Sequence, residues 1–87
     1  MRFTDRPAYD RYARAFPAVI KRFKATVLAA DEQPVVLEGE WPHQKVVLLE
    51  FPDEAEAHRF ETDPEYARIA QARRAGTDGV ILRVRGF

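Results

Sequence analysis

The apolar residues of this chain change their spacing along the sequence, and this change restricts the fold to a mixture of helices and strands. In residues 6–23 they recur every three or four positions, which places them on one face of a helix. Residues 53–76 repeat that spacing. In residues 26–31, 45–51 and 80–85 the apolar residues form short runs that are typical of β-strands. The pattern therefore predicts an α+β fold with two helical regions and three main strands.

Two shorter segments complete the expected order. The residues around Phe3 form a brief opening strand, and residues 35–38 form a short companion strand after a turn. The helical region 53–76 contains a restart at Asp63-Pro64, since an N-cap residue followed by proline is typical of a helix start. The simplest packing of this order is a ferredoxin-like β-α-β-β-α-β sandwich, with two helices on one face of one antiparallel sheet.

The length and the missing cysteines indicate a single domain that folds without disulfide bonds. A chain of 87 residues is too short to bury two cores, so we expect one domain over residues 1–87. Small secreted domains are usually held by disulfides, and this chain has no cysteine, so we expect a cytoplasmic protein. No apolar run approaches the roughly 20 residues that cross a bilayer.

The balance of charges and the missing nucleophiles argue against several classes of function. The 14 basic and 14 acidic residues cancel, so we expect neither nucleic acid nor a membrane as a partner. Serine and cysteine are both absent, so the usual hydrolase triads cannot be built. The four glycines are scattered and form no phosphate-binding loop.

Several short sequence motifs together resemble one known family, the "domain of unknown function 1330". The resemblance covers nearly the whole chain. Its carriers are Asp5-Arg6-Pro7-Ala8-Tyr9 with Tyr12, Val36-Leu37-Glu38-Gly39-Glu40-Trp41-Pro42, Leu48-Leu49-Glu50-Phe51-Pro52 with Ala55 and Ala57, Asp63-Pro64-Glu65-Tyr66, and Arg73. The resemblance implies a dimeric α/β barrel, in which two ferredoxin-like sheets face one another, and it implies no established reaction. Proteins of that architecture include cofactor-free monooxygenases, muconolactone isomerases, haem-binding enzymes and stress-responsive proteins, so the fold alone does not give the function.

The longest apolar strand independently favours a homodimer. Val46 and Leu48 point to one side of the strand, whereas Val47, Leu49 and Phe51 point to the other. Two helices cover only one face of a sheet, so the other face needs a second copy of the chain. An interface of ~800 Å² per subunit is the standard size for such an association.

The first strand is where the sequence departs from the family. Members usually begin with several apolar residues, whereas only Met1, Arg2 and Phe3 precede the turn at Thr4-Asp5. Either the first strand is short, or the natural chain begins further upstream. In both cases we expect every residue from Met1 to be drawn into the sheet, because unpaired central backbone groups are costly.

Four residues are candidates for binding a ligand: Tyr9, Trp41, His58 and Arg73. Tyr9, Tyr12 and Tyr66 could present hydroxyl groups to a cavity or serve as ordinary core residues, and Tyr9 is the preferred candidate because it lies close to the first strand. Trp41 could cap the core, anchor an interface or stack on a ligand.

Arg73 continues the apolar stripe that contains Tyr66, where a charge is rarely buried without a partner. It could form an ion pair with Glu38 or Glu50, or it could bind the carboxylate of a ligand through its planar fork.

The two histidines are weak candidates for chemistry. His58 lies among charged residues of a helix, where it is either a solvated side chain or a base, and His43 lies in a loop. No nearby acidic residues complete a metal-binding motif with the two histidines, so we expect neither a metal nor a cofactor.

The sequence leaves two hypotheses open. The first is a homodimer that binds a small organic molecule in a pocket between helices and sheet. The second is a non-catalytic interaction module or stress-associated module. Whether the protein is an enzyme stays undecided at this point.

Overall fold

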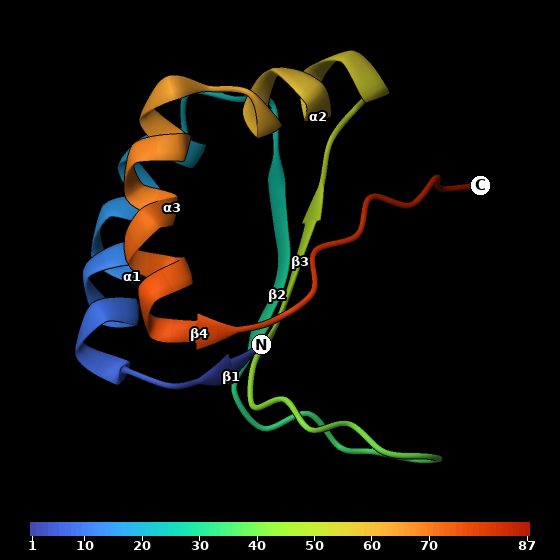
Figure 1. Ribbon diagram of the computed structural model, residues 1–87. Coiled ribbons are helices and arrows are strands. Elements are labelled where there is room, and N and C mark those ends of the chain that lie inside the picture. The colour runs from blue at the N-terminus through green and yellow to red at the C-terminus, as the bar shows by residue number, and fades with distance from the viewer.

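The computed structural model describes residues 1–87 and contains three helices and two small antiparallel sheets. Helices α1 and α3 lie side by side, and the ribbon of β2 and β3 stands opposite them (Figure 1). The predicted α+β class is confirmed. No helix has the length and apolar character needed to cross a membrane. In chain order the elements are β1 (Arg2–Phe3), α1 (Arg6–Ile20), β2 (Thr26–Asp31), β3 (Val46–Glu50), α2 (Glu54–Glu61), α3 (Pro64–Gly76) and β4 (Thr77–Asp78).

Local signals in the sequence define the helix starts. Asp5, Asp53 and Asp63 are the N-caps of α1, α2 and α3, and each carboxylate accepts a hydrogen bond from the backbone N–H three residues later. Proline follows the cap in α1 and α3, where its missing N–H costs no helical bond. The expected restart at Asp63-Pro64 is confirmed. Helix α1 passes through Pro17 and ends at Ile20, short of the predicted residue 23.

The core lies between the helices and one face of the β2–β3 ribbon. It consists of aromatic and aliphatic side chains, and two residues at the end of β3, Leu49 and Phe51, pack against it. Phe60 is its most connected aromatic ring, with its centroid 4.2 Å from that of Tyr66 and 5.4 Å from that of Phe23. The buried members of this core are Tyr9, Tyr12, Val19, Phe23, Phe60 and Ile69.

The other face of the β2–β3 ribbon has no cover within the chain. The strands pair antiparallel from Thr26 opposite Glu50 to Asp31 opposite Val46, with a bulge near Leu28. Leu28 and Leu48 are 57% and 52% exposed. The ribbon is therefore apolar on a side that one copy of the chain leaves in water.

The single four-stranded sheet that we predicted is not formed, because β1–β4 and β2–β3 are separate two-stranded sheets. Residues 80–85 and 35–38 form no strand, so those two predictions are wrong. The reason at the C-terminal end is the length of β1. It pairs with β4 only at Arg2–Asp78 and Phe3–Thr77, so no strand continues beside residues 80–85. That segment makes no backbone hydrogen bond, and only Arg83 ties it to α2.

Met1 connects the two sheets. Its amino group donates to the Lys45 carbonyl at 2.6 Å, and its carbonyl accepts from the backbone N–H groups of Gln44 and Lys45 at 2.8 and 3.0 Å. Met1 also lies against Gly79, where an added Cβ would be 3.1 Å from the Met1 Cβ. The chain from Met1 onward therefore lies between β4 and the residues that precede β3, although Met1 itself is not part of a strand.

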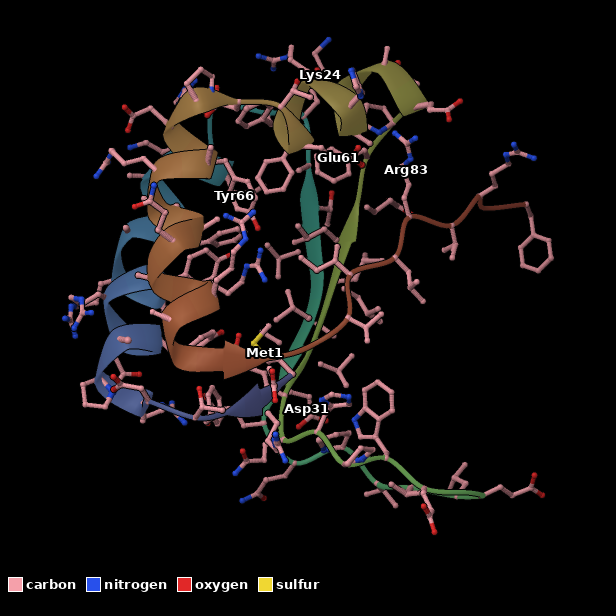
Figure 2. The ribbon with its side chains drawn as sticks, in the orientation of Figure 1. Met1, Lys24, Asp31, Glu61, Tyr66 and Arg83 are labelled. Atoms are coloured by element: carbon pink, nitrogen blue, oxygen red, sulfur yellow. The ribbon has the colours of Figure 1, made fainter.

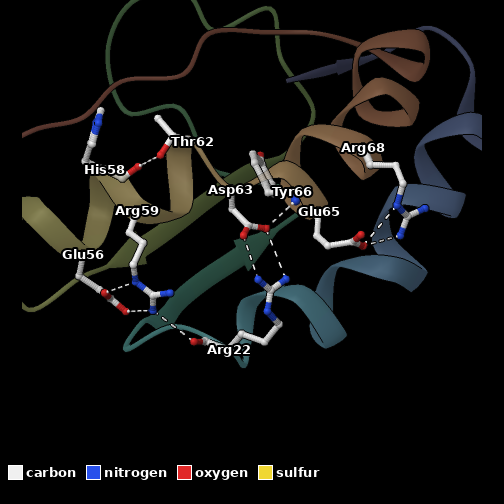
Figure 3. A network of polar contacts seen from close by, with 9 residues as sticks. All are labelled: Arg22, Glu56, His58, Arg59, Thr62, Asp63, Glu65, Tyr66 and Arg68. Carbon is white, nitrogen blue, oxygen red and sulfur yellow. Dashed lines mark hydrogen bonds and ion pairs between the residues drawn. The ribbon is translucent and has the colours of Figure 1, made fainter.

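A polar network fixes α2 and α3 against the turn that follows α1 (Figure 3). Arg22 donates to Asp63 at 2.9 Å, and the Glu56 carboxylate accepts from Arg59 and from the backbone N–H of Lys24, both at 2.8 Å. The hydrogen bonds from Arg59 and Lys24 lower the pKa of Glu56 to about 2. Asp63 also accepts from the Tyr66 backbone N–H at 2.9 Å, so this network holds the first turn of α3 in place.

Candidate functional site

Two tyrosine hydroxyl groups meet between α1 and α3. Tyr12 lies on the buried face of α1, and Tyr66 lies in the first turn of α3, which the Asp63 cap positions. Their hydroxyl oxygens are 3.3 Å apart and form a hydrogen bond. Figure 2 shows Tyr66 on the side of α3 that faces the β2–β3 ribbon. Because neither hydroxyl has another partner in the chain, the pair is a polar island beside the apolar core.

Arg73 adds a positive charge to this island. It lies seven residues after Tyr66, which places both side chains on the same face of α3. Its Nε is buried and has no hydrogen-bond partner, and its guanidinium forms no ion pair with any carboxylate. The structural ion pair with Glu38 or Glu50 is therefore not formed. We refer to Tyr12, Tyr66 and Arg73 as the Tyr–Tyr–Arg cluster.

Hydrogen-bond accounting shows that the cluster contains donors that no group of the protein accepts from. Between Tyr12 and Tyr66 one hydroxyl donates and the other accepts, so one O–H is left over. The guanidinium of Arg73 carries five N–H donors, and the one on the buried Nε has no acceptor within the protein.

The protonation state of Tyr12 supports a donor role. Burial raises the pKa of the Tyr12 phenol far above its usual value, and the neighbouring Tyr66 hydroxyl raises it further. The charge of Arg73 lowers this pKa, but by less than the other two causes raise it. Tyr12 therefore keeps its proton at neutral pH and can donate a hydrogen bond, and it is a poor candidate for a general base.

Tyr9 packs beside the Tyr–Tyr–Arg cluster. It is 2% exposed, and its ring centroid lies 5.7 Å from that of Tyr12. The Lys45 ammonium lies 4.9 Å from the centre of the Tyr9 ring, in cation–π geometry. Of the four predicted ligand-binding residues, the structure thus places Tyr9 and Arg73 around the same two hydroxyl groups.

His58 and Trp41 lie elsewhere. His58 is an exposed residue of α2 (Figure 3), and its Nδ1 lies 4.0 Å from a carboxylate oxygen of Glu61. Trp41 is 46% exposed in the loop that projects from the other end of the ribbon (Figure 1), and its ring packs edge-on against His43 at 4.7 Å between centroids. His43 lies in this loop, as predicted, and is partly covered, with a buried Nδ1 that has no partner.

The two main hollows of the surface are both open and lie away from the cluster. One, of about 360 Å³, is lined by residues at the end of the ribbon that include Phe23, Glu50 and Phe51. The other, of about 350 Å³, is lined by Arg2, by Pro42 and His43 of the loop, and by residues 78–80. Neither hollow contains a residue of the Tyr–Tyr–Arg cluster. No group of three or more histidine or acidic side chains is placed to hold a metal ion.

Sequence reasoning considered Tyr12 and Tyr66 but preferred Tyr9. A signal for the cluster was present in the spacing, because Tyr66 and Arg73 share a face of their helix and Tyr12 follows Tyr9 by one turn. What the sequence does not show is that the two helices bring these faces together.

Comparison with known proteins gives the family and no function. No curated protein and no solved structure matches the chain. A family model described as "Domain of unknown function (DUF1330)" matches residues 1–87, which is the whole chain, and the fold and the cluster described above are therefore those of a member of this family.

Proposed function

We propose that this protein binds a small organic molecule at the Tyr–Tyr–Arg cluster. The observation that supports this most directly is the buried Nε of Arg73, which has no partner and lies on the same helix face as Tyr66. An unsatisfied buried donor costs roughly 1–3 kcal/mol, and a bound molecule that supplies an acceptor removes that cost. Tyr66 and Arg73 are half-buried, so part of each side chain is in contact with solvent.

The proposed form of the protein is a homodimer, the dimeric α/β barrel, in which the uncovered faces of two β2–β3 ribbons meet. Its support is the uncovered face of the ribbon, with Leu28 and Leu48 more than half exposed, and the apolar segment that carries Val80, Ile81 and Leu82 at 69–79% exposure. A second copy is the expected cover because the chain has no net charge that would favour a charged partner. The alternative, an interaction module without ligand chemistry, would use the same apolar face for another protein.

We propose a binding role and assign no reaction. The two hydroxyl groups and the guanidinium are donors at neutral pH, and the cluster contains no carboxylate or histidine to accept a proton.

Ligand binding is tested by thermal-shift measurements with a library of small organic acids, amides, alcohols and amines. Binders should raise the melting temperature of the wild type. They should fail to do so in a Tyr12→Phe/Tyr66→Phe variant, which removes only the two hydroxyl oxygens. A library in which no compound distinguishes the two proteins would contradict the proposed site.

The dimer is tested by size-exclusion chromatography with light scattering at micromolar concentration. The expected mass is twice the 10.0 kDa of the chain. Leu48→Glu should give the monomer mass, because a charge in the centre of a dry interface is costly, whereas Glu50→Gln at the ribbon end should stay dimeric. A monomeric wild type would remove the dimer from the proposal while leaving the ligand site untouched.

A further inference from the structure

We infer that the ligand of the Tyr–Tyr–Arg cluster is a monocarboxylate, whose two oxygens accept from Arg73 and from the free tyrosine hydroxyl, and whose apolar body lies against the aromatic core. This inference deepens the proposed function and rests on it. The cluster supplies donors of two kinds, a guanidinium and a hydroxyl, and neither has all of its donors paired within the chain.

The charge of the site matches one negative charge. Arg73 has no carboxylate partner, whereas the two cations beside the Tyr9 ring, Lys45 and Arg6, are already paired. Lys45 lies 3.6 Å from Glu32, and Arg6 donates to both Glu32 and Asp10 at 2.9 Å. One unpaired cation in a half-buried position is balanced by a monoanion, whereas a phosphate dianion would leave a negative charge uncompensated.

The donor geometry favours a carboxylate over a neutral acceptor. A guanidinium presents parallel N–H groups that match the two oxygens of a carboxylate, and hydrogen bonds between ionised partners are about twice as strong as neutral ones. The hydroxyl left over from the Tyr12–Tyr66 pair gives a third donor, which fixes the plane of the ligand head. A primary amide of the same shape would bring its own N–H donors toward a site that already has too many.

The surroundings favour an apolar, ring-sized body for the ligand. The ring of Phe60 lies 4.2 Å from that of Tyr66, and Phe16 lies 5.6 Å from Tyr12 between ring centroids. Leu49 packs on the same core from β3. A carboxylate that carries an aromatic or cycloaliphatic ring would therefore place its apolar part beside side chains of the same kind.

The test compares two pairs of probes of nearly equal shape: benzoate with benzamide, and cyclohexanecarboxylate with its amide. Binding to the full-length wild type is measured by calorimetry and by ¹⁵N-resolved NMR of the arginine side chains. The carboxylates should bind at least about tenfold more tightly than the amides, as expected for a charge-assisted hydrogen bond. They should also move the Nε–H resonance of Arg73, which is otherwise unpartnered.

Two matched variants distinguish the specific hydrogen bonds of Arg73 from the general effect of a positive charge. Arg73→Lys keeps the charge but loses the fork, and it should weaken carboxylate binding by about tenfold or more. Arg74→Lys changes an exposed neighbour on the same helix and should alter binding less than about twofold. Circular dichroism verifies that both variants are folded, and the Nε–H measurement on the wild type needs no variant.

Each outcome bears on a different statement. Tighter binding of carboxylates with a shifted Arg73 resonance supports the inference. Equal binding of carboxylates and amides, sensitive to loss of the two hydroxyl groups, would overturn the carboxylate and leave the proposed small-molecule site standing. If none of the four probes, inorganic phosphate or the library compounds bound, the carboxylate inference and the proposed small-molecule site would both be overturned.

Discussion

Replacing Gly76 with alanine should destabilise the protein by at least about 3 kcal/mol, because the added methyl group would collide with the backbone. A Cβ at this position would lie 2.5 Å from the backbone nitrogen of Tyr9 and 2.6 Å from the carbonyl oxygen of Asp5. Neither atom can move without shifting the start of α1. The Gly76 carbonyl also accepts from the N–H groups of Thr4 and Asp5 at 2.9 and 3.1 Å, so the same displacement would weaken both hydrogen bonds.

Urea unfolding of the Gly76→Ala variant measures this effect, with Gly86→Ala as the matched control. A Cβ at Gly86 would meet nothing within 4 Å, so that variant should unfold within about 0.5 kcal/mol of the wild type. Equal stability of both variants would mean that α1 and α3 are further apart than described. Since this contact sets the spacing of the two helices, a partly folded Gly76→Ala protein should also lose the hydrogen bond between Tyr12 and Tyr66.

The helices could be predicted from the sequence because their signals are local. Asp5, Asp53 and Asp63 cap the three helices, and the spacing of apolar residues gives the buried faces. The strands β2 and β3 were also predicted, since each is an apolar run that needs only its hairpin partner. Both kinds of element are determined within about 25 residues of chain.

The segment 80–85 shows where local reasoning fails. Its apolar run is as strong a strand signal as that of β3, yet a strand forms only beside another strand. The neighbour it requires is β1, which pairs as far as Asp78 and then ends. The Tyr–Tyr–Arg cluster was only partly predictable for a similar reason. Arg73 and the tyrosines stand out by type and spacing, but the missing carboxylate partner is visible only in three dimensions.

Replacing Arg73 with methionine should have two opposite effects. Binding of organic acids should fall by a factor of ten to a hundred, because the charged donor is lost while the apolar stem is kept. The free energy of unfolding without ligand should stay equal or rise by about 1 kcal/mol, since methionine removes an unpaired, half-buried charge. A functional residue that is held at a cost to stability behaves in this way, whereas a structural one does not.

The most direct test of a ligand site at the cluster is therefore the unfolding free energy of ligand-free Arg73→Met, compared with the wild type and with Arg74→Met. Arg74 is exposed on the same helix, so its replacement should leave stability within about 0.5 kcal/mol and leave acid binding unchanged. We predict that Arg73→Met is at least as stable as the wild type and has lost its acid-induced stabilisation. A loss of about 2 kcal/mol or more with acid binding retained would show that Arg73 serves the fold, and would contradict the ligand site.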